Sequence, residues 1–229
     1  MVNKDNILIV ESKNDKYFIE AFIDYLNIDN VDIAPPICSI DDYECLNTLS
    51  LKSLENKLEI LAGQVGKKGI EKIGIIIDAD KAGIDKRIEL INEALQIIDE
   101  NLHLNVCNNF VTSKALDVEI ACYIMNVDGF GELETVLKAI KSQDSTHADC
   151  LDSWKQCLEK KDKTITNKEF NKFWVNIYQR FDHCIKKDKK QAGKKCNFAI
   201  SMKKDIWNFE SDKLNELKNF LNLFKTKTV

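Results

Sequence analysis

The sequence has very little arginine and no long apolar run. Only two of its 33 basic residues, Arg87 and Arg180, are arginines. Because arginine is the side chain most often used to read base edges, this scarcity argues against direct readout of a nucleic-acid sequence. No apolar run approaches the ~20 residues that span a bilayer, so no membrane segment is expected. The first apolar run is short and ends in Glu11, unlike a signal peptide, which favours a cytoplasmic protein.

Paired cysteine motifs are also missing, although the chain has eight cysteines. None forms a CxxC pair, and no Cys/His cluster has the spacing of a zinc finger, so a zinc site is not expected. Scattered cysteines in a cytosolic protein are expected to be free thiols. The glycines at 63, 66 and 69 indicate a loop, but they lack the spacing of a phosphate-binding P-loop.

Charge is distributed unevenly along the chain. Residues 1–150 hold 14 basic and 27 acidic side chains, whereas residues 151–229 hold 19 basic and 10 acidic ones. An acidic body with a basic second half is an asymmetry linked to binding of a polyanion. The composition changes near residue 141. We therefore expect an α/β catalytic domain at 1–141 and a basic helical extension at 142–229 that packs on or completes the same domain.

Short apolar runs alternate with helically spaced apolar positions in the first part of the chain. We expect strands at 7–10, 31–40 (an edge strand or loop with both prolines), 73–77, 102–110 and 119–125, and helices at 16–26, 51–61, 85–101 and 132–140. Asn14 or Asp15 is expected to start the first helix. This order predicts a three-layer α/β fold with a mainly parallel sheet. Beyond it we expect a helical hairpin at 153–185 and an amphipathic helix at 212–224. The aromatic face of the hairpin is expected to be core or dimer interface, with a base-stacking platform as the alternative.

Carboxylates follow two of the expected strands. Glu11 ends the first strand, and Asp78 and Asp80 follow the most β-branched one. If the chain is still extended there, Asp78 and Asp80 point to the same side. Because the first strand of a doubly wound sheet is often central, Glu11 is expected near them. Carboxylates held together favour a hard divalent cation such as Mg²⁺ or Mn²⁺, and the alternative is a solvated turn.

The spacing Glu11-xxx-Asp15, followed later by Asp78-x-Asp80-xx-Gly83, resembles the Toprim domain of topoisomerases, bacterial primases, ribosomal-RNA maturases and OLD-type nucleases. The likeness covers roughly residues 5–125, and Ser12 stands where that family commonly has glycine. Residues 131–137 and 207–224 resemble, more loosely, the small stand-alone Toprim-like proteins related to the OLD type. The resemblance implies a three-layer Toprim-like (Rossmannoid) fold.

The resemblance also implies an activity, namely Mg²⁺- or Mn²⁺-dependent hydrolysis of nucleic acid, DNA or RNA. Its metal ligands would be Glu11, Asp15, Asp78, Asp80 and Glu134. Glu11 is alternatively a general acid/base, and Asp15 and Glu134 are alternatively acids favoured at helix N-termini. The tyrosine domain of topoisomerases and the zinc module of primases are absent. Small proteins of this kind resemble effectors of antiphage defence, which implies an ATPase partner; a homo-oligomer is also considered.

A lysine-rich stretch in the second half is the expected nucleic-acid contact. Its members are Lys186, Lys187, Lys189, Lys190, Lys194 and Lys195. Lys190 or Lys194 would lie near the scissile phosphate and stabilise developing charge. The alternative is a solvated helix face, as most lysine runs are.

Three other classes compete with a nuclease. A haloacid-dehalogenase-type phosphatase also carries a DxD after a strand, but Lys81 follows Asp80 here where Thr or Val is usual. A receiver domain needs a phosphorylatable Asp and a lysine at another strand end. A non-catalytic Toprim-like protein could bind nucleic acid as the regulatory subunit of an ATPase. Substitution of Glu11 separates these classes, because only the Toprim hydrolase depends on it.

Overall fold

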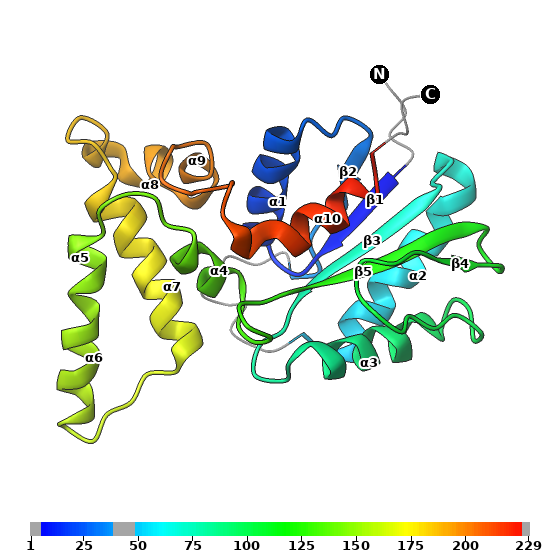
Figure 1. Cartoon of the computed structure of the whole chain (residues 1–229), viewed down its shortest axis with the longest axis horizontal. Coiled ribbons are helices and arrows are strands. Elements are labelled where there is room, and N and C mark those ends of the chain that lie inside the picture. The colour runs from blue at the N-terminus through cyan, green and yellow to red at the C-terminus, as the bar shows by residue number, and fades with distance from the viewer. Residues whose placement is uncertain (1–5, 39–48, 226–229) are drawn as a thin grey trace.

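Five strands form a single sheet at the centre of the molecule (Figure 1). The computed structural model describes residues 6–38 and 49–225. The strands are β1 (Asn6–Val10), β2 (Val31–Ile33), β3 (Lys72–Asp78), β4 (Val111–Ser113) and β5 (Val118–Met125). Their order is β2-β1-β3-β5-β4, and all neighbours are parallel except β4 and β5. The expected α/β fold with a mainly parallel sheet is therefore confirmed.

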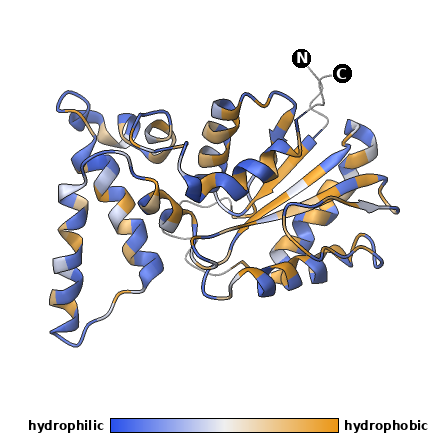
Figure 2. Ribbon diagram, in the orientation of Figure 1, coloured by the Kyte–Doolittle hydropathy of each residue, from blue (hydrophilic) through white to orange (hydrophobic). Residues whose placement is uncertain are grey.

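Helices cover both faces of this sheet. The α-helices are α1 (Lys13–Leu26), α2 (Leu51–Lys68), α3 (Ile84–Leu95), α4 (Leu133–Ala139), α5 (Thr146–Asp149), α6 (Leu151–Glu159), α7 (Asn167–Ile177), α8 (Ala192–Lys195), α9 (Phe198–Ser201) and α10 (Asn215–Asn222). Helices α1, α4 and α10 share one hydrophobic core with the sheet, and α2 and α3 share the other (Figure 1). Figure 2 shows the strands largely hydrophobic between them, as burial on both faces requires.

Helix α10 packs closely on the central strand β3. A Cβ atom added at Gly74 would meet Leu8 and would lie 2.7 Å from Cζ of Phe224. Glycine at this point therefore lets the aromatic rings next to α10 approach the strand. The Nζ atom of Lys72 donates to the carbonyl oxygen of Leu223 at 3.1 Å. The last part of the chain thus contributes directly to the core of the sheet.

The segment between α4 and α10 forms a helical arm beside the sheet (Figure 1). The hairpin expected at 153–185 is present as α6 and α7. Phe170, Trp174 and Tyr178 are buried, as expected for a core face, whereas Phe173 and Phe181 are exposed.

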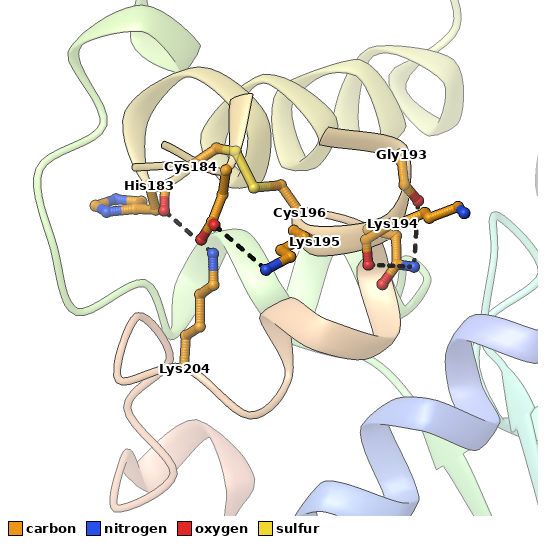
Figure 3. The surroundings of a disulfide bond; sticks show 9 residues. His183, Cys184, Gly193, Lys194, Lys195, Cys196 and Lys204 are labelled. Atoms are coloured by element: carbon orange, nitrogen blue, oxygen red, sulfur yellow. Dashed lines mark hydrogen bonds and ion pairs between the residues drawn. A yellow bond between two sulfur atoms is a disulfide. The ribbon is translucent and has the colours of Figure 1, made fainter. Parts of the chain in front are cut away.

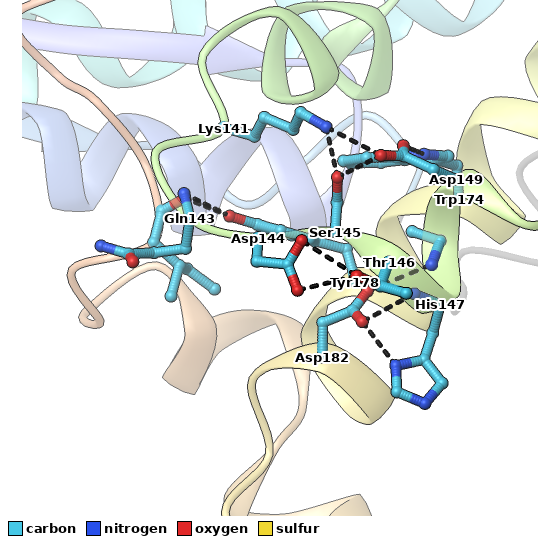
Figure 4. A network of polar contacts seen from close by, with 12 residues as sticks. Lys141, Gln143, Asp144, Ser145, Thr146, His147, Asp149, Trp174, Tyr178 and Asp182 are labelled. Carbon is cyan, nitrogen blue, oxygen red and sulfur yellow. Dashed lines mark hydrogen bonds and ion pairs between the residues drawn. The ribbon is translucent and has the colours of Figure 1, made fainter.

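Polar contacts anchor this arm (Figure 4). Nε1 of Trp174 donates to Asp149 at 3.1 Å. The backbone N–H of Gln143 donates to the hydroxyl of Tyr178 at 3.2 Å, and His147 pairs with Asp182 at 2.6 Å. These contacts tie α7 to the chain that follows α4.

Several expected helix boundaries were wrong. Helix α1 begins at Lys13 with Ser12 as its N-cap, rather than at Asn14 or Asp15. Helix α2 continues through the glycines at 63 and 66, where a loop was expected, and ends at Lys68, with Gly69 as its C-cap in the left-handed region (φ 62°). Its apolar face, which includes Leu61 and Val65, packs on the sheet and outweighs the low helix propensity of glycine.

The strand expected at 102–110 is not a strand. Leu102 and Leu104 are buried, which explains their apolar pattern. The backbone of Leu104, however, pairs with the side chain of Asn92 and not with a neighbouring strand. Asn92 donates to the carbonyl of Leu104 at 2.9 Å and accepts from its N–H at 2.8 Å. The strand comes later, at β4, and α3 ends at Leu95 rather than near 101.

The second strand is an edge strand, as expected, but is limited to Val31–Ile33. Pro35 and Pro36 follow it after Ala34. Residues 39 and 40, at the end of the expected segment, lie outside the described residues. In the described part of the chain, no helix is long and apolar enough to cross a membrane.

The expectation of free thiols was wrong for part of the chain. Cys184 and Cys196 form a disulfide, with Cα atoms 5.6 Å apart (Figure 3). The short turns between them fold the lysine-rich stretch back on itself, which the linear spacing of the cysteines does not reveal. Cys38 is also disulfide-bonded, and Cys45 lies outside the described residues. The free cysteines found are Cys107, Cys122, Cys150 and Cys157.

Candidate acidic site and cationic cleft

Glu11 and Asp78 lie together at the carboxyl ends of β1 and β3. The two strands are paired in parallel, with Val10 opposite Ile76. The backbone N–H of Asp78 donates to Oε2 of Glu11 at 3.3 Å. Both side chains are buried, at 8% and 7% exposure. The sheet therefore brings these two predicted site residues into contact.

Asp15 closes the first turn of α1. Its carboxylate accepts from the backbone N–H of Ser12 at 2.7 Å, and its own N–H donates to the Ser12 hydroxyl. This reciprocal pair is a capping box, so Ser12 and Asp15 both stabilise the helix start. Asp15 is 3% exposed, and its charge acts on both Glu11 and Asp78.

The N-terminus of α4 supplies a third side of the site. The backbone N–H of Leu133 donates to Oδ1 of Asp78 at 3.2 Å. Glu134, in the first turn of α4, is buried at 5% exposure. Glu132 is the N-cap of the helix and pairs with the hydroxyl of Thr135. The four buried carboxylates Glu11, Asp15, Asp78 and Glu134 are called the acidic cluster below.

Burial and repulsion between carboxylates raise the pKa values of Glu11 and Asp78. The pKa of Glu11 rises from 4.5 to about 7, mainly through burial and then through the charge of Asp15. The pKa of Asp78 lies well above its ordinary value, again through burial first, followed by the charges of Asp15, Glu11 and Glu134. A cation among these groups would relieve both effects.

The side chain of Asp80 does not point to the same side as that of Asp78, contrary to the expectation from their spacing. Its φ of 49° places it in the left-handed region, so the chain is no longer extended. Its backbone N–H and C=O pair with those of Gly131 at 2.7 and 2.9 Å. Its carboxylate pairs with two basic side chains. Arg87 donates to Oδ2, and Nζ of Lys168 donates to Oδ1 at 2.9 Å.

Lys168 and Arg87 are functional candidates that the sequence analysis missed. Burial alone would lower the pKa of Lys168, but its hydrogen bond to Asp80 and the charge of Asp78 raise it. Arg87 is 3% exposed, and its Nε atom has no partner among the described residues. Arg87 lies on α3, just after the DxD, and a pattern of strand, DxD and helix could have indicated it. Lys168 lies 88 residues from Asp80, and no local signal marks it.

Asp80 also lines a cleft of about 900 Å³. It lies between the loop after β3, the turn after β5, and helices α6 and α7. Its cationic lining residues are Lys81, Arg87, Lys138, Lys155 and Lys168, and its acidic ones are Asp80, Glu132 and Asp152. Phe130, which also lines it, is 58% exposed. We call this the cationic cleft.

The lysine-rich stretch lies elsewhere, around the disulfide (Figure 3). Lys186, Lys187, Lys189, Lys190, Lys194 and Lys195 are all exposed. Within the described part of the chain, no hydrogen bond or ion pair joins Lys190 or Lys194 to Glu11, Asp78 or Asp80. Their contact with nucleic acid and the catalytic role of Lys190 or Lys194 stay predictions.

The acidic cluster has the donor chemistry that a hard divalent cation requires. Its donor atoms are all carboxylate oxygens, and the raised pKa values of Glu11 and Asp78 reflect burial and repulsion between carboxylates, which a cation would offset. Among the residues described, no three His, Cys, Asp or Glu side chains are already arranged as a ligand set. Asp80 is engaged by Lys168 and Arg87, so it could join a cation only after leaving at least one of them.

Fold and site together define an α/β protein with an acidic cluster at the carboxyl ends of its central strands and a cationic cleft beside it. The profile of a family described as "Protein of unknown function (DUF3226)" matches residues 5–225. The chain therefore belongs to that family. No curated protein and no solved structure matches the chain.

Proposed function

We propose that this protein is a metal-dependent phosphodiester hydrolase that acts on nucleic acid. The observation that carries the proposal is the juxtaposition of the acidic cluster with the cationic cleft through Asp80. Asp80 lines the cleft, and its charge also raises the pKa of Glu11 in the cluster. Carboxylates for a cation and lysines for phosphates are the two requirements of this chemistry.

Glu11 and Asp78 would hold Mg²⁺ or Mn²⁺, with Asp15 and Glu134 as further ligands. Such a cation polarises a phosphoryl oxygen and lowers the pKa of a bound water. The protein contributes position and charge. The hydrogen bonds from the N–H groups of Asp78 and Leu133 fix the carboxylates of Glu11 and Asp78. If Glu11 is not a ligand, its pKa of about 7 suits a general acid/base.

The cationic cleft would bind the nucleic-acid backbone. Four lysines and one arginine line it, and lysines neutralise phosphates without reading sequence. The exposed ring of Phe130 offers a face on which a base can stack. We therefore favour an unpaired strand as the substrate.

Lys168 takes the role that the sequence analysis gave to Lys190 or Lys194. Its Nζ atom donates a hydrogen bond to Asp80 of the DxD. When Asp80 turns toward the acidic cluster, the ammonium group of Lys168 is released next to the scissile phosphate, where it stabilises developing negative charge. The resemblance to Toprim proteins supports this proposal. On the same resemblance we propose a role in antiphage defence and an ATPase partner.

The test is cleavage of nucleic acid by the purified protein. Plasmid DNA, single-stranded DNA, tRNA and ribosomal RNA are each incubated with Mg²⁺, Mn²⁺ or EDTA. We expect cleavage that EDTA abolishes and that Asp78→Asn reduces by on the order of 100-fold or more. Glu20→Gln, which changes an exposed carboxylate on α1, serves as the matched control and should cleave normally. Hydrolysis of a phosphomonoester that survives Glu11→Gln would instead indicate a phosphatase.

A second candidate function is supported by the state of Asp80. Both of its carboxylate oxygens are already bound to cations. A protein that keeps this arrangement would bind nucleic acid in the cleft without cleaving it, as the regulatory subunit of an ATPase. Binding that survives EDTA, with no cleavage under any metal condition, would favour this function.

A further inference from the structure

A second cavity, of about 380 Å³, lies apart from the cationic cleft. The first turns of α1, the second half of α7 with the π-helix Tyr178–Asp182, and the segment that follows α7 around Cys196 form its walls. It shares no lining residue with the cationic cleft. It is therefore a separate candidate binding site, of a size that suits a small molecule.

Hydrogen-bond donors dominate the polar lining of this cavity. Lys13, Lys172 and Arg180 carry positive charge there, and Glu134 carries the one negative charge in the lining. Lys13 is also the first residue of α1, a helix of 14 residues whose N-terminus attracts anions. Tyr17 and Phe198 add aromatic surface. The cavity thus combines positive charge with a ring-sized apolar wall.

Gln179 is the independent sign of a ligand. It belongs to the π-helix, it is 4% exposed, and it lines the cavity. Its Nε2 atom has no hydrogen-bond partner among the described residues. Buried amide donors are nearly always satisfied, and π-helical turns concentrate at functional sites. The Nε2 atom is itself shielded from water, so a ligand oxygen would satisfy this donor once the amide shifts toward the cavity.

We propose that this cavity binds a phosphorylated ligand of nucleotide size. The phosphate oxygens would accept from Nε2 of Gln179 and face Arg180 and Lys172, while the base would rest against the aromatic wall. Glu134 belongs both to the lining of this cavity and to the acidic cluster, so the two sites adjoin. The proposal does not require a metal ion in the acidic cluster, and titration in EDTA therefore tests it separately from the proposed hydrolase activity. The phosphate could belong to a free nucleotide or to the 5′ end of a nucleic-acid strand.

Calorimetric titration of the full chain in EDTA tests the proposal. The probes are AMP, ATP, adenosine and a 5′-phosphorylated dinucleotide. We expect AMP or the dinucleotide to bind, and the one that binds more tightly identifies the source of the phosphate. Adenosine should bind at least 10-fold more weakly than AMP. Gln179→Met, which keeps the volume and removes the donor, should weaken phosphate-ligand binding at least 10-fold.

Two further variants keep the test decisive. Arg180→Met changes an exposed side chain that should not affect folding, and it should weaken binding as Gln179→Met does. Lys160→Met removes an exposed lysine outside both cavities and should bind normally. No binding of any phosphorylated probe, equal binding of adenosine and AMP, or unchanged binding in both Gln179→Met and Arg180→Met would overturn the proposal.

Discussion

Glu11 is a buried carboxylate whose charged form is opposed by its surroundings. Its pKa in the folded protein is about 7, against 4.5 for the unfolded chain. Between these values the folded state binds a proton that the unfolded state has released. The stability contributed by this proton is complete below pH 4.5 and is lost as the pH rises through 7.

The first prediction follows from this difference. In EDTA, the free energy of unfolding should be higher at pH 5 than at pH 8, with Glu11 contributing about 3 kcal/mol to the difference. Urea unfolding at the two pH values measures it. Glu11→Gln should flatten the dependence, whereas the exposed-site control Glu20→Gln should not. An identical pH dependence in Glu11→Gln and the wild type would contradict the burial of this charge.

Lys168 is the second residue on which the account depends. Lys168→Met should reduce metal-dependent cleavage at least ~10-fold, because it removes the cation beside Asp80. Lys168→Arg, which keeps the charge, should retain more activity than Lys168→Met. The rate of cleavage of a labelled single strand measures both, with Lys160→Met as the control. Wild-type rates in Lys168→Met would exclude this role.

The sequence predicts only part of the site at this scale. Glu11 and Asp78 could be placed together, because each ends a β-branched strand and such strands pair in parallel. The direction of Asp80 could not, because it depends on a left-handed turn fixed by pairing with Gly131. Lys168 could not either, because it reaches the site only through the packing of α7.

Among the elements, the close packing of α10 and the residues after it on β3 gives a prediction for stability. Gly74→Ala should destabilise the protein by about 1–3 kcal/mol, because its Cβ would overlap Leu8 and Phe224. Gly66→Ala in α2 is the matched control, since nothing lies within 4 Å of its added Cβ. It should stabilise the protein by about 1 kcal/mol through helix propensity. Thermal or urea unfolding that ranks the two variants in the opposite order would contradict this packing.

Element types were predicted better than element boundaries. The order of strands and helices in the first part of the chain follows from alternating apolar runs and helical spacing. The strand expected at 102–110 was wrong because Asn92 satisfies the backbone of Leu104 in place of a neighbouring strand. The glycines at 63 and 66 predict a loop by local propensity, but burial of one face of α2 keeps them helical. In both cases a tertiary contact outweighed a local signal.

At the scale of the whole molecule, the second half of the chain does more than supply charge. Residues near α10 complete the core on one face of the sheet, and α7 forms one wall of the cationic cleft. The charge asymmetry indicated a polyanion partner but not where it would bind. The lysines that line the cleft are distributed over both halves, whereas the conspicuous lysine-rich stretch is enclosed by the disulfide between Cys184 and Cys196.

This disulfide gives a prediction for the stability of the whole chain. Cross-linking cysteines that lie 12 residues apart should stabilise the fold by about 3 kcal/mol through the entropy of the unfolded chain. Replacing Cys184 and Cys196 by serine should lower the stability by that amount. Urea unfolding measures the difference, and Cys150→Ser, at an exposed free thiol, should have little effect. Equal stability of the double variant and the wild type would show that the bond does not constrain the fold.

The central claim is that the acidic cluster holds a divalent cation. Titration with Mn²⁺, followed by its electron paramagnetic resonance signal at pH 8, tests this claim without any assumption about the substrate. We predict that the wild type binds Mn²⁺ and that Glu11→Gln and Asp78→Asn each weaken binding by at least ~10-fold, while Glu20→Gln binds as the wild type does. Wild-type Mn²⁺ affinity in both cluster variants, or no binding by the wild type, would contradict the claim.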